Sequence, residues 1–131
     1  MEKFTRREEE LMEFLWGYGQ PLTSYNMVDL CKDRDWKDSY IHIMIRSLEK
    51  KGAIECCGVE KSGIKYARKF RPAITKEEYY VQLALSAGVD RELFAKTAAG
   101  LVRKDSSNDQ EKLIQELEEI IKEFKEREGE E

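Results

Sequence analysis

The most constraining feature of the sequence is the stretch from residue 38 to residue 70, where a helical pattern changes to a strand-like pattern at a glycine. Apolar residues recur there at i, i+4 and i+7, which predicts a helix from residue 38 or 39 to residue 51. Gly52 follows, where a left-handed C-cap needs a glycine. Two strand-like runs, 54–59 and 64–70, then predict a hairpin with Glu60-Lys61-Ser62-Gly63 as its turn. The apolar residues of the predicted helix are Ile41, Ile45 and Leu48.

The residues before this stretch predict two more helices. Thr5-x-x-Glu8 has the spacing of a capping box, in which the two side chains bond to otherwise unpaired N–H groups, so we expect a helix over residues 5–18. Glycine and proline between residues 17 and 21 end it, and Thr23 or Ser24 caps a short second helix. Helix, short helix, helix and basic hairpin is the element order of a winged helix-turn-helix domain.

The second half of the chain predicts helices only. Thr75-x-x-Glu78 is a second capping box, a further helix spans about 90–103, and a last amphipathic helix follows a polar loop at 105–109. The apolar stripe of that last helix has no room to bury itself within so short a tail, so it implies a partner, most simply a second copy. The expected fold is mainly α with a small β-hairpin: a winged-helix DNA-binding domain over 1–73 and a helical dimerisation domain over 74–131.

The charges are unevenly distributed along the chain. The net charge is -4 over 131 residues, yet residues 37–71 hold nine Lys and Arg against four Asp and Glu. Residues 76–131 hold nine against fifteen. Positive charge is therefore concentrated on the segment that would face DNA, and the acidic second half is a poor partner for nucleic acid.

Several other classes of protein are disfavoured by the sequence. No apolar stretch is long enough to cross a bilayer, so we expect a cytoplasmic protein with no membrane partner. One histidine leaves little for acid–base catalysis, and we expect neither an enzyme nor a cofactor. His42 with Cys31 and the pair Cys56-Cys57 lacks the spacing of a zinc module, so no metal site is predicted. The cysteine pair is an ordinary part of a strand or, alternatively, a redox sensor.

Four segments of the first half carry a family resemblance. They are Phe4-Thr5-x-x-Glu8-x-x-Leu11-Met12-x-x-Leu15-Trp16, Pro21-Leu22-Thr23, the run from Ile41 to Gly52, and Phe70-x-Pro72 with Glu77-Glu78-Tyr79. In these segments the chain resembles the penicillinase-repressor family and its copper-responsive relatives. The resemblance implies a winged helix followed by a helical dimer domain, and repression of genes from a dyad operator in double-stranded DNA. The Asn-Phe cleavage pair of the penicillinase branch and the cysteine-rich tail of the copper branch are absent, so the sequence names no protease, sensor or inducing signal.

The resemblance implies which residues contact DNA. The helix over 38–51 enters the major groove, with Arg46 reaching guanine or phosphate and Ser39 placed at the helix N-terminus for phosphate. The family usually has threonine where Tyr40 and Ile43 stand, so the operator sequence is not carried over. The expected DNA-binding residues are Thr23, Ser24, Lys37, Ser39, Tyr40, His42, Ile43, Arg46, Lys50, Lys61 and Lys65.

The second half supplies the expected dimer contacts. These residues are Tyr79, Val81, Leu85, Leu93, Phe94, Leu101, Leu113, Leu117, Ile120, Ile121 and Phe124. These charged residues also have interpretations that do not involve DNA. A charged helix face is often simply solvated, and lysines on a hairpin also protect a sheet edge from pairing with another chain. A winged-helix protein-interaction module without sequence-specific DNA binding is the alternative function.

Overall fold

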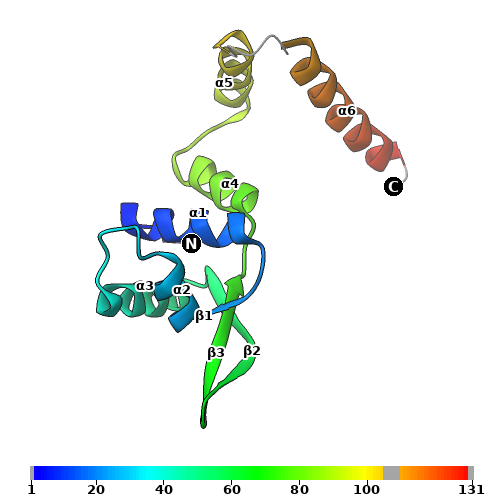
Figure 1. Cartoon of the computed structure of the whole chain (residues 1–131). Helices are drawn as coiled ribbons and strands as arrows, with labels where there is room; N and C mark the ends of the chain where they lie inside the picture. The colour runs from blue at the N-terminus through cyan, green and yellow to red at the C-terminus, as the bar shows by residue number, and fades with distance from the viewer. Residues whose placement is uncertain (1, 105–109, 130–131) are drawn as a thin grey trace. The chain divides into compact units, whose positions relative to one another are not determined.

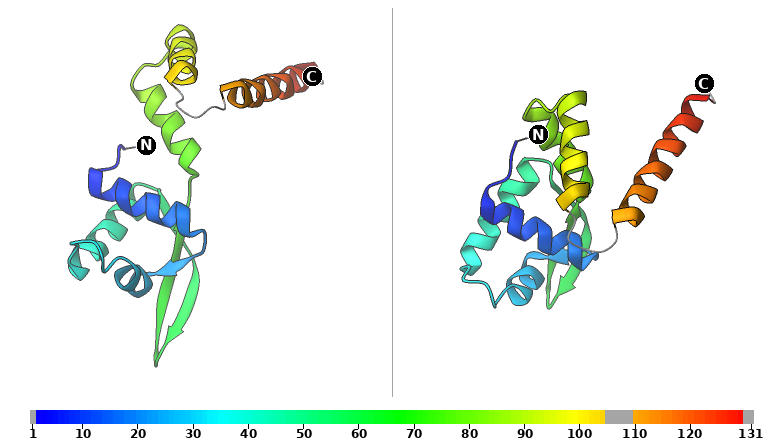
Figure 2. Two further views of the ribbon diagram at one scale, coloured as in Figure 1. Left: turned by 45° about the horizontal axis from the view of Figure 1, so that its top comes forward. Right: turned by 90° about the horizontal axis from the view of Figure 1, so that it is seen from above.

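The computed structural model describes residues 2–104 and 110–129, which fall into two compact units, Met1–Ser86 and Ala87–Glu131. Unit 1 contains four helices and three strands in the described residues, and unit 2 contains two helices (Figures 1 and 2). The elements of unit 1 are α1 (Arg6–Tyr18), β1 (Leu22–Thr23), α2 (Ser24–Leu30), α3 (Asp38–Lys50), β2 (Ile54–Ser62), β3 (Lys65–Pro72) and α4 (Lys76–Ser86). Those of unit 2 are α5 (Arg91–Lys104) and α6 (Gln110–Gly129).

The strands form one antiparallel sheet in the order β1-β3-β2. Leu22 pairs with Phe70 at the β1 edge, and β2 and β3 form the long hairpin that projects from the helices in Figure 1. Three helices with this small sheet make a winged helix, which confirms the predicted fold class, and the hairpin is called the wing below. The sequence did not predict β1, because two residues are too few to show a period.

The wing is longer than the sequence predicted. Residues 60–62 continue β2, and the turn lies at Gly63-Ile64, so the predicted turn at 60–63 is wrong. The physical reason is that β2 is exposed along all but its first residue. A strand exposed on both faces has no alternation of apolar and polar residues to mark where it ends.

The predicted helix ends are confirmed. The Thr5 hydroxyl accepts the Glu8 N–H at 3.2 Å and the Glu8 carboxylate accepts the Thr5 N–H at 2.8 Å, as a capping box requires. Thr23, not Ser24, caps α2, and its hydroxyl accepts the Asn26 N–H at 3.1 Å. The left-handed φ of 78° at Gly52 lets the chain leave α3 and turn into the sheet.

The core of unit 1 lies where the three helices of the winged helix meet the sheet. The predicted stripe of α3 is buried in it, together with Leu11 and Leu15 of α1 and Met27 of α2. Tyr79 of α4 completes the core: it is 1% exposed, and its ring stacks on Phe4 with 4.1 Å between centroids. Its hydroxyl accepts the Phe4 N–H and donates to Glu9, each at 3.2 Å.

Tyr79 therefore holds unit 1 together and is not available to a second subunit, which corrects its assignment to the dimer interface. The cause is that α4 packs on α1, as the bonds from Trp16 Nε1 to the Ile74 carbonyl (2.9 Å) and from Lys76 to Glu13 (2.8 Å) show. Contacts thus group α4 with the winged helix, so the compact units divide after residue 86, whereas the sequence predicted a boundary after residue 73.

A buried ion pair joins the start of α1 to the end of α3. Lys51 Nζ lies 2.6 Å from Glu8 Oε1, and the two side chains are 13% and 3% exposed. Burial raises the pKa of Glu8, but the hydrogen bonds from Lys51 and from the Thr5 backbone outweigh it, so the pKa lies below its ordinary value. Glu8 is therefore ionised at neutral pH and depends on Lys51 for its compensation.

Unit 2 exposes much of its apolar surface. Helices α5 and α6 contact each other, yet no residue of α5 is buried. The exposed apolar residues of the unit include Leu93 (47%), Phe94 (66%), Leu101 (67%), Ile120 (49%) and Ile121 (54%). Leu113 and Leu117 are half-buried, and the side chain of Phe124 lies outside the described residues.

Replacing Tyr79 by alanine is expected to destabilise unit 1 by about 4 kcal/mol, since it removes a buried aromatic ring and leaves a cavity. Its neighbour Tyr80 is 47% exposed and is the matched control, with an expected loss below about 1 kcal/mol. Urea unfolding followed by circular dichroism measures both. Equal losses for the two variants would contradict the placement of Tyr79 in the core.

Glu8→Gln is expected to lower the free energy of unfolding by roughly 3 kcal/mol at pH 7, because Lys51 then loses its buried partner. The folded-state pKa of Glu8 is depressed, so its contribution is complete above the unfolded-state pKa of about 4.3 and is lost as the pH falls through the folded-state value. The difference between wild type and variant should therefore shrink below about pH 4. Urea titrations between neutral and acidic pH test this, and a pH-independent gap would contradict it.

Candidate nucleic-acid interface

Helix α3 presents an exposed face opposite its buried stripe. Ile43 is 58% exposed, and Ser39, Arg46 and Lys50 are also exposed. Lys37, the residue before the helix, makes no side-chain cap bond, so the first N–H groups of α3 are left without that partner. Five of the residues that the sequence assigned to DNA thus lie together on or beside one exposed helix face.

Four other assigned residues are less accessible. Tyr40 is half-buried and packs against the core, and His42 is half-buried with its ring edge-on to Tyr25, 6.2 Å between centroids. Thr23 is 3% exposed, and its hydroxyl is already engaged in capping α2, so its assignment as a DNA contact is corrected. Ser24 is half-buried and lines the groove between α3 and the wing.

A groove of about 390 Å³ separates α3 from β3 and is called the wing groove here. Arg46 lines it from the helix, and Tyr66, Arg68 and Phe70 line it from the strand. These three strand residues alternate in sequence, so they share one face of β3. Its lining residues are Ser24, Tyr25, His42, Ile45, Arg46, Glu49, Tyr66, Ala67, Arg68 and Phe70.

Two arginines in the wing groove have different surroundings. Arg68 is paired with Glu49 of α3 and lies over the Phe70 ring, 4.8 Å from its centroid. Arg46 forms no ion pair with any side chain of the described part of the chain. Of the two guanidinium groups in the groove, that of Arg68 is paired with a carboxylate and that of Arg46 is not. Three residues of the groove were not predicted from the sequence: Tyr25, Glu49 and Tyr66. The alternation of residues along β3 was a signal for Tyr66.

The cysteines differ in their surroundings. Cys56 and Cys57 are both exposed, as is nearly all of β2, and the pairing with β3 is irregular between Cys56 and Gly58. The hydrogen bond with Arg68 lowers the pKa of Cys56, and a hydrogen bond with the Gly58 backbone lowers it further. Burial raises the pKa of Cys31. Among the residues that the structure describes, no three His, Cys, Asp or Glu side chains gather in a way that would hold a metal ion.

The wing carries charge and apolar surface beyond the groove. Lys61 lies opposite Tyr66 and Ser62 opposite Lys65 in the register of the two strands. Ile64, in the turn, is 95% exposed. Both lysines that the sequence assigned to DNA therefore lie near the tip of the wing, away from the core.

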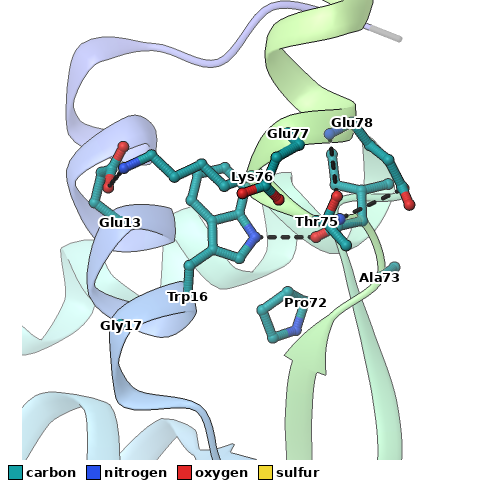
Figure 3. A pocket seen from close by; sticks show the side chains of 10 residues that line it. Glu13, Trp16, Gly17, Pro72, Ala73, Thr75, Lys76, Glu77 and Glu78 are labelled. Carbon is teal, nitrogen blue, oxygen red and sulfur yellow. Dashed lines mark hydrogen bonds and ion pairs between the residues drawn. The ribbon is translucent and has the colours of Figure 1, made fainter. Parts of the chain in front are cut away.

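A second hollow, of about 530 Å³, lies between α1 and the segment that joins β3 to α4 (Figure 3). Trp16 forms part of its wall, and its indole donates to the Ile74 carbonyl. Lys76 is paired with Glu13, and Glu78 and Thr75 cap α4. These polar groups are engaged in holding α4 to the winged helix.

None of the helices in the described residues is both long enough and apolar enough to cross a membrane.

Comparison with curated proteins gave no match. Among solved structures, the zinc-responsive MarR family member ZitR of Lactococcus lactis is 15% identical, with a TM-score of 0.44 over 94% of this chain and 78% of that one. The structure of ZitR in complex with DNA is 17% identical, with a TM-score of 0.40 over 94% of this chain and 77% of that one. The adhesin competence repressor AdcR of Streptococcus pyogenes is 19% identical, with a TM-score of 0.40 over 93% of this chain and 81% of that one.

The family comparison covers most of the chain. The model of the penicillinase repressor family matches residues 4–123, from the segment before α1 into the last helix. The match thus includes the capping box of α1, the exposed face of α3, the wing, α5 and the larger part of α6. The chain belongs to the penicillinase repressor family of DNA-binding transcriptional regulators.

Proposed function

We propose that this protein represses transcription by binding a dyad operator as a homodimer, with α3 of each subunit in the major groove. Family membership supports the coarser statement, a DNA-binding transcriptional repressor. The observation that carries the finer proposal is the exposed face of α3, on which Arg46 stands without an ion-pair partner beside the wing groove.

Charge supports this orientation. Residues 37–71, which contain α3 and the wing, have nine basic and four acidic residues. Two of the acids, Glu49 and Glu55, are paired with Arg68 and Arg71. Cations on α3 and on the wing would neutralise phosphates on either side of one groove, which supplies most of the sequence-independent affinity for DNA.

Individual residues take different roles in this proposal. Arg46 makes a bidentate contact to guanine or bonds to phosphate, and the exposed Ile43 packs against a thymine methyl group. Ser39 and the uncapped N–H groups of α3 hold a phosphate at the helix N-terminus. The wing groove receives the sugar–phosphate strand that runs between the base-reading helix and the wing, with Tyr25 and Tyr66 on its walls.

The homodimer rests on unit 2. In unit 2, Phe94 and Leu101 are about two-thirds exposed, and exposing apolar surface to water is energetically unfavourable. Self-association is the simplest way to cover that surface. Ile120 and Ile121 add to that surface from α6, and Val81 and Leu85 are exposed on α4. A dimer would set the distance between two copies of α3 and hence the spacing of the operator half-sites.

The alternative is a protein-interaction module on the same fold. The half-buried Tyr40 and the apolar Ile43 on α3 favour it to some extent, because both are unusual for the family position. Salt separates the two functions: phosphate neutralisation makes affinity fall steeply with ionic strength, whereas an apolar protein contact does not. Selection from a library of labelled dyad sequences at two salt concentrations tests this and identifies the operator.

Arg46→Ala is expected to weaken binding to the selected operator by roughly 30-fold, because a bidentate contact is lost. Arg7→Ala on α1 removes the same charge from a residue outside the exposed face of α3 and the wing groove, and is expected to change affinity by less than about 2-fold. Fluorescence anisotropy measures both. Equal effects of the two substitutions would mean that α3 does not read the operator.

Phe94→Glu is expected to convert the dimer into a monomer, since it places a charge in the apolar surface of unit 2. Ala99 lies five residues further along α5, about 140° around the helix, so Ala99→Glu adds the same charge to another face and should leave the dimer intact. Sedimentation velocity distinguishes the two states. A wild-type protein that sediments as a monomer would contradict the proposed dimer.

A further inference from the structure

We infer that Ile64, at the tip of the wing, is a wedge that enters the minor groove of the bound operator and unstacks one base step there. This inference rests on the proposed function, because it takes α3 to occupy the adjoining major groove. It adds a second place at which the protein distinguishes DNA sequences, on a residue that makes no contact with α3.

The exposure of Ile64 is the first reason. At 95%, it is the most exposed of the large apolar side chains in the described residues. Gly63, with a φ of 66°, closes the turn and puts Ile64 at the outermost point of the wing. Figures 1 and 2 show this tip projecting away from the helices of unit 1, so no element of that unit covers it.

The reach of the wing is the second reason. The third strand, β1, pairs only as far as Lys69, so beyond that residue the wing is a two-stranded ribbon, which the Arg68–Glu49 ion pair still joins to α3 near its base. Ile64 lies five positions before Lys69, and five residue steps give about 17 Å of extended strand. Half a turn of B-DNA is also about 17 Å, the separation between a major groove and the next minor groove. A wing that starts beside α3 therefore ends at the neighbouring minor groove.

The placement of charge is the third reason. Lys61 pairs with Tyr66 and Lys65 pairs with Ser62, one register position apart, so the two lysines lie on opposite faces of the ribbon. The minor groove is about 6 Å wide, and phosphates form both of its walls. A ribbon that enters it edge-on meets phosphate on both faces, and this wing carries one lysine for each. An apolar pocket on a protein partner would not require cations on two faces.

The chemistry of wedges explains the choice of side chain. Proteins that bind in the minor groove insert aliphatic or aromatic side chains between base pairs and kink the duplex. Pyrimidine–purine steps unstack at the lowest cost, so we expect such a step in each half-site at the position of the wing tip. Ile64 would then select DNA by its deformability, without hydrogen bonds to bases.

The test uses the full-length protein and the selected operator, with 2-aminopurine placed at successive steps of the minor groove beside each half-site. The wild type is expected to raise the fluorescence at one step per half-site. Ile64→Ala should abolish that rise and weaken affinity about tenfold. Ile64→Leu, which keeps an aliphatic wedge, should retain both.

Val59→Ala is the matched control, because Val59 is 61% exposed on the same hairpin but lies away from the tip. It should leave the fluorescence and the affinity unchanged. Ile64→Ala is expected to keep the wild-type circular dichroism and unfolding midpoint, since the side chain contacts little in the fold.

Two results would overturn the inference alone: wild-type binding without a rise in 2-aminopurine fluorescence, or an Ile64→Ala variant that keeps both the rise and the affinity. Wild-type protein that shows no sequence-selective, salt-dependent binding would overturn the proposed function and the wedge together.

Discussion

The structure depends on the burial of one stripe of α3. Ile41, Ile45 and Leu48 lie in the core, and an α-helix that buries residues at this spacing must expose the residues between them on its other side. Arg46 and Ile43 are exposed for that reason. The same three aliphatic side chains that stabilise unit 1 therefore fix the angle at which α3 faces outward, so core packing and the proposed recognition of the operator share one helical period.

The parts of the fold that were predictable are those that have a period or a cap. The stripe of α3, the capping box at Thr5 and the glycine after α3 depend on neighbouring residues, and all three are confirmed. The full length of the wing was not predictable, because both faces of β2 are exposed and the sequence pattern does not change where the strand ends. The place of Tyr79 was missed for a different reason: a contact between residues 4 and 79 leaves no trace in local spacing. For the proposed interface, the residue types and the family resemblance were enough to predict that α3 takes part. The wing groove could not be predicted from the sequence, because its walls come from α2, α3 and β3, which meet only in the folded structure.

The wing groove contains two arginines, of which Arg68 is held by neighbouring side chains and Arg46 is not. Glu49 and Phe70 hold the Arg68 side chain, so part of its conformational entropy is already lost before any ligand arrives. Its charge is partly offset by the carboxylate, however, and the net attraction for phosphate is reduced. Arg46 differs in both respects: within the described residues, no paired carboxylate offsets its charge, and no ion pair restricts the conformations of its side chain. In the proposed complex, the Arg68–Glu49 pair would keep the helix and the strand at a defined separation while the Arg46 guanidinium adapts to the DNA. The exposed Cys56 thiol lies beside Arg68.

The contact between Phe4 and Tyr79 has a consequence for how the protein is made. Its two partners are 75 residues apart in the chain, so the segment before α1 waits for α4 to leave the ribosome before its ring and its N–H group are covered. During synthesis, the first 72 residues contain the whole sheet and three of the helices but not the side chain that closes the core. Contacts of such long separation slow folding, because the chain between them must be ordered first. The nascent winged helix should therefore stay open to chaperones and proteases until α4 emerges, which ties its final folding to the synthesis of the segment that leads into unit 2.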